Sequence, residues 1–165
     1  MAVEPKRFVT KMKSKTTKKS NGGSVDKKVL VFGTFDGIHT GHIHFLYEAK
    51  KLTGNSGGFF VSVSSDQSTM YRKDHLPKKN ASARVKDIKI LNIANKVSVG
   101  DKVLGEWTVV KKVKPDIIAV GYDQNILKKE LTYFQKLSKI PFRIVTISSF
   151  KPKKLHSSII KIRNL

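Results

Sequence analysis

The chain has 165 residues, enough for one domain with its own core and too few for two large domains. It contains no cysteine, which excludes a disulfide framework, a thiolate nucleophile and a cysteine metal site. The formal net charge of +21 indicates a polyanionic partner or substrate, or a solvated lysine-rich surface. Only five of the 33 basic residues are arginines, which favours the solvated surface over sequence-specific nucleic-acid binding.

Residues 1–28 differ in composition from the rest of the chain. They hold nine lysines or arginines against two acids, Glu4 and Asp26, with little apolar periodicity. This composition predicts a basic, disordered tail before a folded domain over 29–165, and it leaves open a tether to nucleic acid or a membrane surface. No apolar stretch approaches membrane-spanning length and no signal-peptide pattern is present, so we expect no membrane span and a cytoplasmic location.

The most informative stretch is VLVFGTFDGIHTGH, over 29–42. An unbroken apolar run predicts a buried strand over 29–34, and the spacing of Ile43, Leu46 and Leu52 predicts a helix after it. His39 and His42 therefore fall where a strand ends and a helix begins, which is the ligand-binding edge of a parallel sheet. Two imidazoles, a glycine at 41 and free N–H groups at a helix start suit an anionic phosphate group.

Within this stretch, GTFDGIHTGH resembles the signature of the HxGH nucleotidyltransferase superfamily. The form is similar to the cytidylyltransferase-like branch, which includes glycerol-3-phosphate cytidylyltransferases and archaeal-type FAD synthases. The resemblance implies that His39 and His42 stabilise the transition state as a substrate oxygen attacks the α-phosphorus of a nucleotide. It also implies a nucleotide-binding role for the other matching positions, which are Gly33, Thr34, Phe35, Asp36 and Gly41.

A second buried strand is predicted over 59–64, and Asp66 follows its end. The polar stretch 67–80 is interpreted as a functional or solvated loop. In the resembling families this place carries basic residues that close over the triphosphate, which makes Arg72 and Lys73 candidates. A helix is expected over 82–94, with Arg84 near its start. Arg84 matches a family arginine and is interpreted as a phosphate clamp, with an exposed helix arginine as the alternative.

A short strand over 97–99 and a helix over 106–113 come next, with Trp107 early in that helix. The strand predicted over 116–120 is followed at once by Gly121, Tyr122 and Asp123, again at the ligand edge. The segment KPDIIAVGYDQ resembles archaeal-type FAD synthases, which ranks FMN adenylylation first. Gly121 and Asp123 are nucleotide-binding candidates; the weaker candidates for binding the acceptor are Asp66, Trp107 and Tyr122.

The last predicted elements are an amphipathic helix over 126–139, with Leu127, Leu131, Phe134 and Leu137 inward, and a strand over 142–147. Ser157 and Ser158 match a family position at the start of a final helix, where hydroxyls and amides bind phosphate. A family arginine before them is replaced by Lys151.

Strands alternating with helices predict an α/β fold: a Rossmann-like, doubly wound parallel sheet in an α/β/α sandwich. We expect a nucleotidyltransferase that uses ATP and FMN with Mg²⁺ accompanying the triphosphate. The alternatives are a CTP-dependent cytidylyltransferase acting on glycerol 3-phosphate or a similar phosphoalcohol, and a non-catalytic nucleotide- or RNA-binding protein. The histidine spacing lacks a zinc-site pattern, so no resident metal is expected; family analogy suggests a homodimer.

Overall fold

The computed structural model describes residues 25–150, and within them it contains a sheet of five parallel strands. The strand order is β3-β2-β1-β4-β5, so the chain winds outward from β1 in one direction and then in the other. This arrangement confirms the predicted doubly wound fold. The strands are β1 (Val29–Gly33), β2 (Phe59–Val63), β3 (Lys96–Val99), β4 (Ile117–Gly121) and β5 (Arg143–Ile147). The helices are α1 (Thr40–Lys51), α2 (Asp66–Lys73), α3 (Ala81–Ile90), α4 (Thr108–Val113) and α5 (Asn125–Ser138).

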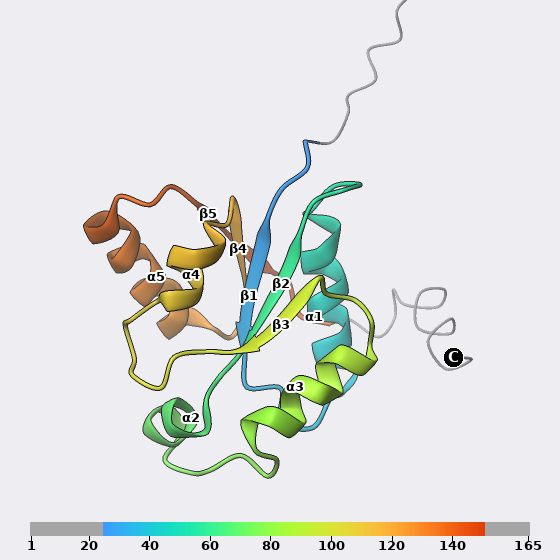
Figure 1. The fold of residues 1–165 in the computed structure, drawn as a ribbon, viewed down its shortest axis with the longest axis vertical. Helices are drawn as coiled ribbons and strands as arrows, with labels where there is room; N and C mark the ends of the chain where they lie inside the picture. Colours follow the sequence, from blue (N-terminus) through green and yellow to red (C-terminus); the bar gives the residue numbers. More distant parts are fainter. Residues whose placement is uncertain (1–24, 151–165) are drawn as a thin grey trace, which may run out of the picture.

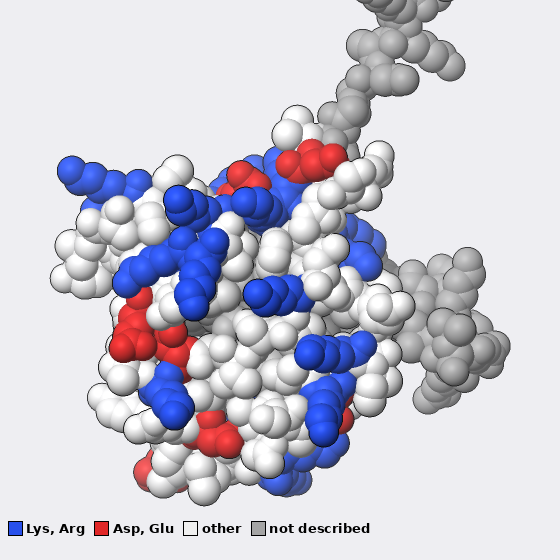
Figure 2. Space-filling view, viewed as in Figure 1, with Lys and Arg blue, Asp and Glu red and all other residues white. Residues whose placement is uncertain are grey.

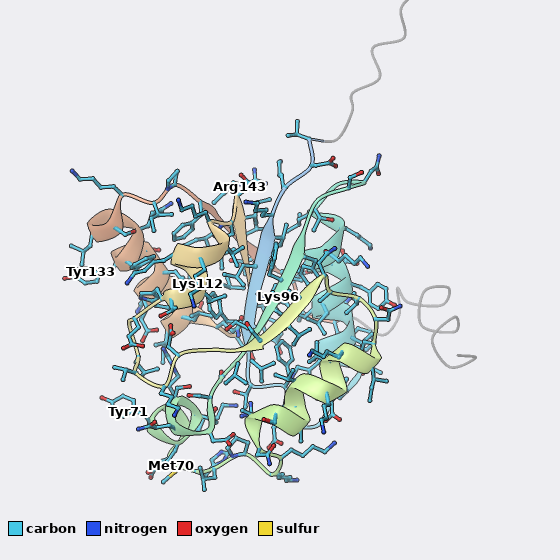
Figure 3. All side chains as sticks on the ribbon, in the orientation of Figure 1. Met70, Tyr71, Lys96, Lys112, Tyr133 and Arg143 are labelled. Atoms are coloured by element: carbon cyan, nitrogen blue, oxygen red, sulfur yellow. The ribbon has the colours of Figure 1, made fainter. Side chains whose placement is uncertain are left out.

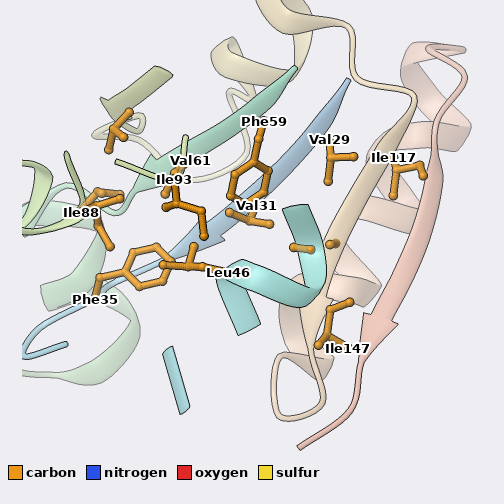
Figure 4. Packing of buried hydrophobic residues seen from close by; sticks show 14 residues of the cluster. Val29, Val31, Phe35, Leu46, Phe59, Val61, Ile88, Ile93, Ile117 and Ile147 are labelled. Atoms are coloured by element: carbon orange, nitrogen blue, oxygen red, sulfur yellow. The ribbon is translucent and has the colours of Figure 1, made fainter. Parts of the chain in front are cut away.

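Two apolar cores fill the two faces of the sheet. Figure 1 shows α1 and α3 on one face, α4 and α5 on the other, and α2 beyond the carboxyl ends of the strands. Val29 and Val31 point into the first core and Leu30 into the second, because successive strand residues face opposite sides. Figure 4 shows the first core, where Leu46 of α1 faces these valines. Burial on both faces explains why β1 has no polar alternation.

The polar stretch after β2 was predicted as a loop, and this prediction is wrong at its start, where α2 forms. Ser65 caps the helix, with its Oγ accepting from the Ser68 backbone N–H at 3.1 Å. The inward positions are Ser68 and Thr69, whose hydroxyls bond to Ser65. A helix that buries hydroxyl groups instead of apolar side chains gives no apolar periodicity in the sequence.

Two helix boundaries and one inward-facing position differ from prediction. The helix expected over 82–94 ends at Ile90, and Asn92 takes a left-handed conformation with φ 48°. Trp107 precedes α4 instead of lying within it. Leu137 is exposed, because Ile140 and Phe142 beyond α5 fill the second core beside Phe134.

The central strands separate at the carboxyl edge of the sheet. β1 pairs with β2 along all five of its residues, but it pairs with β4 only over Val29–Val31 opposite Ile117–Ala119. β4 meanwhile stays paired with β5 as far as Gly121. The interrupted ladder lies between the two strands where the winding direction reverses, which is where open α/β sheets bind ligands.

Within residues 25–150 no helix combines the length and apolar character needed to cross a membrane. The basic segment at the start of the chain lies almost wholly outside the described residues, as does Lys151, so the division into tail and domain stays a prediction.

Candidate active site

A pocket of about 1000 Å³ lies at the carboxyl edge of the sheet, over the opening between β1 and β4. Its volume is at the upper end of the range for small-molecule sites, so it has room for a nucleotide and a second substrate. The sequence-predicted residues that line it are Gly33, Thr34, Phe35, Asp36, His39, Gly41, His42, Arg72, Lys73, Trp107, Gly121, Tyr122 and Asp123. Asp66 and Arg84 are not part of this lining, and Ser157 and Ser158 lie outside the described residues.

His39 is the N-cap of α1. Its Nδ1 accepts the backbone N–H of Gly41 at 3.1 Å and that of His42 at 3.4 Å. Two donors aimed at Nδ1 place the ring proton on Nε2. The sequence predicted that the N–H groups of the first turn bind phosphate. In this structure those of Gly41 and His42 donate to the His39 imidazole instead. Gly41 is needed for a related reason: a Cβ there would lie 3.0 Å from Cε1 of His39.

His42 stacks on His39, with ring centroids 3.8 Å apart and planes inclined by 27°. The ring of Phe35 meets it edge-on at 5.4 Å. Burial, and after it the neighbouring His39, lower the pKa of His42 below the ordinary 6.5. His42 is therefore neutral at pH 7 in the free protein and gains affinity for a proton when a phosphate anion arrives.

The turn after β1 is strained and filled by Phe35. Phe35 is 2% exposed and has φ 53°, a left-handed conformation that costs a bulky residue free energy. Its ring folds back over Gly33, where a Cβ would meet Cζ at 2.5 Å. Burial of the ring holds the turn that delivers His39 and His42, so Phe35 supports the site from below.

Asp36 ties the histidine loop to the segment before α3. Its carboxylate accepts the backbone N–H of Lys78 at 2.7 Å and that of Lys79 at 3.1 Å. The hydrogen bond from Lys78 is the main reason that the pKa of Asp36 lies below its usual value. Asp36 therefore lines the pocket while its charge is directed at the protein backbone.

Arg84 lies beneath the pocket, fully buried. Its guanidinium donates to the carbonyls of Lys79 at 2.9 Å, Thr34 at 2.6 Å and Ser64 at 2.9 Å, and to Asp66 Oδ1 at 2.6 Å. The alternative of an exposed helix arginine is wrong, and the expectation of a phosphate clamp does not match this geometry. Three loop carbonyls need donors here, and the fork of five N–H groups supplies them. The same contacts turn Asp66 toward Arg84.

α2 places basic side chains at the mouth of the pocket. Nη2 of Arg72 lies 2.6 Å from Glu130 Oε2 on α5, so the pair joins opposite rims, and the exposed Lys73 lines the pocket beside it. Figure 3 shows Met70 and Tyr71 on the same helix; both side chains are exposed, and Tyr71 also lines the pocket. Glu130 was missed by the sequence analysis, because a lone acid within a lysine-rich helix carries no motif.

The wall opposite the histidines is aromatic. Trp107 meets Phe32 edge-on with ring centroids 5.8 Å apart, and it packs on Phe134 at 5.6 Å. Trp107 therefore belongs partly to the second core and partly to the pocket. Tyr122 is 60% exposed beside Asp123, above the end of β4.

The basic surface gives no single site. On the face drawn in Figure 2 the lysines and arginines form several groups with uncharged surface between them. Figure 3 places Lys96, Lys112 and Arg143 on three different elements, β3, α4 and β5. Nucleic-acid binding and a homodimer stay predictions.

Comparison with known proteins gives consistent matches. A family model described as Cytidylyltransferase-like matches residues 30–163. The chain is 39% identical over 109 residues to a FAD synthase of Korarchaeum cryptofilum, covering 64% of this chain and 73% of that protein. It is 35% identical over 130 residues to a FAD synthase of Methanothermus fervidus, covering 78% and 88%. A solved structure titled as a lipopolysaccharide core biosynthesis protein, from Thermoplasma volcanium, superimposes with a TM-score of 0.65 at 36% identity, covering 75% of this chain and 98% of that one.

Proposed function

The chain belongs to the cytidylyltransferase-like family and is a nucleotidyltransferase, and on this premise we propose that it transfers the adenylyl group of ATP to FMN. The products are FAD and pyrophosphate. The observation that carries the proposal is the stacked pair of His39 and His42, held at the open carboxyl edge of the sheet. The name FAD synthase on relatives that share 35–39% of aligned residues supports FMN as the acceptor.

The reaction needs no protein nucleophile. A phosphate oxygen of FMN forms a bond to the α-phosphorus of ATP, and the bond from that phosphorus to the bridging oxygen of the β-phosphate breaks. Pyrophosphate leaves with the electron pair, and no proton transfer is required when the FMN phosphate is a dianion. The protein contributes position and charge stabilisation, as is usual for phosphoryl chemistry.

His39 and His42 act on the charge that grows at the α-phosphate. With Nδ1 occupied as a helix cap, His39 presents its Nε2–H group as the donor to that phosphate. His42 lies against it and takes up positive charge as the phosphates bind, because the low pKa caused by burial rises beside an anion. Removal of one such donor typically slows transfer about a hundredfold.

The triphosphate and Mg²⁺ belong at the mouth of the pocket. Arg72 and Lys73 line the pocket from α2, and in this proposal they bind the β- and γ-phosphates. No cluster of three metal-ligating side chains occurs in residues 25–150, and the carboxylates of Asp36 and Asp66 are already bonded to protein donors. Asp123, which lines the pocket, offers one oxygen to a ribose hydroxyl or to the ion. This donor set suits an Mg²⁺ that arrives with phosphate and water ligands and neutralises phosphate charge.

The direct test measures pyrophosphate release with ATP or CTP crossed with FMN or glycerol 3-phosphate, and detects FAD by chromatography. We expect turnover only with ATP and FMN. Turnover with CTP and glycerol 3-phosphate would keep the mechanism and replace the substrates. Salt-dependent RNA binding without turnover in any combination would favour the non-catalytic alternative.

A further inference from the structure

The opening between β1 and β4 leaves main-chain groups without a ladder partner. The pairing stops at Val31 and Ala119, although β1 continues to Gly33 and β4 to Gly121. The Phe32 carbonyl and the Gly121 N–H both lie beyond the last pair. Both groups are part-buried, and such groups need another hydrogen-bond partner, because an unpaired one that is shielded from water costs free energy comparable to a lost hydrogen bond.

The side chain of Gln124 supplies both partners. Its Nε2 donates to the Phe32 carbonyl at 3.0 Å, and its Oε1 accepts from the Gly121 N–H at 2.7 Å. A side-chain amide carries the same donor and acceptor as a peptide group. Gln124 therefore acts as a peptide unit inserted between the two central strands, and it keeps them apart while satisfying both.

The placement of this side chain is not explained by helix capping. Gln124 stands at the N-cap of α5, a position where Ser, Thr, Asp or Asn commonly bonds to the first turn. Gln124 makes no such bond and directs its amide to the sheet instead. A Cβ at Gly121 would lie 2.9 Å from Asp123 Oδ1 and 3.6 Å from Gln124 Oε1, so the turn is packed around this contact.

We propose that Gln124 is a positioning residue for nucleotidyl transfer, and in this respect the inference rests on the proposed function. Its amide fixes the spacing between two loops that face each other across the pocket. One loop follows β1 and ends at His39, the N-cap of α1, whose first turn carries His42; the other follows β4 and carries Asp123. Gln124 also lines the pocket, but both ends of its amide bond to the backbone, so in this proposal it acts through the two loops and not by contact with the reacting phosphorus.

The variant Gln124→Glu tests this role, because the ionised and protonated forms of one side chain differ in whether they can donate to the Phe32 carbonyl. The ionised carboxylate still accepts from the Gly121 N–H, but its second oxygen replaces Nε2 and faces the Phe32 carbonyl, where two acceptors repel each other. The protonated acid restores a donor at that place and is nearly isosteric with the amide. We expect kcat of Gln124→Glu to be about tenfold below wild type near pH 8, as for loss of one hydrogen bond of about 1.4 kcal/mol. Because only the protonated acid can donate to the Phe32 carbonyl, that carbonyl raises the pKa of the introduced carboxyl above the usual value of about 4.3. The deficit relative to wild type should therefore shrink as the pH falls from pH 8 toward pH 5, with KM for ATP and FMN within about twofold.

Two matched variants separate this role from general damage. Gln124→Met has a similar length and no hydrogen-bonding groups, so its deficit in kcat should be the same at both pH values. Gln135→Glu repeats the chemical change where a glutamine amide donates to the Phe142 carbonyl, away from the pocket. It should alter the thermal midpoint without a pH-dependent change in relative kcat. Wild-type kcat in both Gln124 variants would overturn the proposal.

Hydrogen exchange tests the same contact without any turnover. The Gly121 amide should exchange slowly in wild type and in Gln124→Glu, which both keep the acceptor oxygen, and at least about tenfold faster in Gln124→Met. Equal exchange in all three proteins would show that Gln124 does not bridge the strands. If wild type makes no FAD while this exchange pattern holds, the proposed function fails and the structural role of Gln124 stands.

Discussion

The two sides of the pocket are held in different ways. The histidine side is held by hydrogen bonds within the protein: Asp36 accepts two backbone N–H groups, the His39 ring caps α1, and Arg84 donates to three loop carbonyls and to Asp66. The opposite side is open: Tyr122 is 60% and Ile126 70% exposed. The histidines that we propose to act on the reacting phosphorus are therefore held in place before substrate binds, as electrostatic preorganisation requires. The groups that meet the rest of each substrate remain available to solvent.

Removal of Arg84 gives the largest effect expected on the histidine side. Arg84→Met leaves three part-buried carbonyls and the Asp66 carboxylate without this donor, and we expect the free energy of unfolding in urea to fall by about 3 kcal/mol. The matched control is Arg143→Met, because Arg143 is an exposed arginine at the start of β5 (Figure 3). The control should stay within about 0.5 kcal/mol of wild type. Equal stability of the two variants would contradict the view that the histidine side of the pocket is held more firmly than the opposite side.

The ion pair across the mouth should affect substrate binding more than stability. Arg72→Gln should raise KM for ATP about tenfold, because a phosphate contact is lost. Glu130→Gln frees Arg72 from its partner and should lower KM for ATP about threefold, while both variants unfold within about 0.5 kcal/mol of wild type. A rise of KM in Glu130→Gln would mean that Glu130 orients Arg72 for the triphosphate instead of competing with it.

The smallest effect concerns the pH dependence of stability. Because the folded state holds the pKa of His42 below the unfolded value of about 6.5, the unfolded chain binds more protons between the two values. The His42 contribution to stability is complete above about pH 6.5 and is lost as the pH falls toward the lowered pKa. Urea unfolding of wild type should therefore weaken more between pH 7 and pH 5 than that of His42→Gln. Parallel curves for the two proteins would contradict the buried, neutral histidine.

Much of the fold followed from the sequence, and the reasons differ by element. The strands were predicted because burial on both faces gives unbroken apolar runs such as Val29–Phe32. α2 was missed because it buries Ser68 and Thr69 through hydroxyl groups. The roles of Arg84 and Gln124 depend on which backbone groups the loops leave unpaired, and no local pattern carries that information.

The candidate site shows the same division. The positions of His39 and His42 followed from a motif at a strand end, where a histidine can also cap the following helix, as His39 does through Nδ1. Glu130 and Arg72 come from α5 and α2, so their pairing depends on tertiary structure alone. The sequence therefore predicted the candidate site residues, but it did not predict the tertiary contacts that hold their side chains in place.

The most direct test of the account follows the label from ATP into FAD. Purified wild-type protein, His39→Asn and His42→Asn are incubated with FMN, Mg²⁺ and ATP labelled at either the α- or the γ-phosphate. We predict that the α-label appears in FAD and the γ-label in pyrophosphate, with each variant slower by about a hundredfold at unchanged fold. Transfer of the γ-label to the acceptor, or wild-type rates in both variants, would contradict attack at the α-phosphorus assisted by the two histidines.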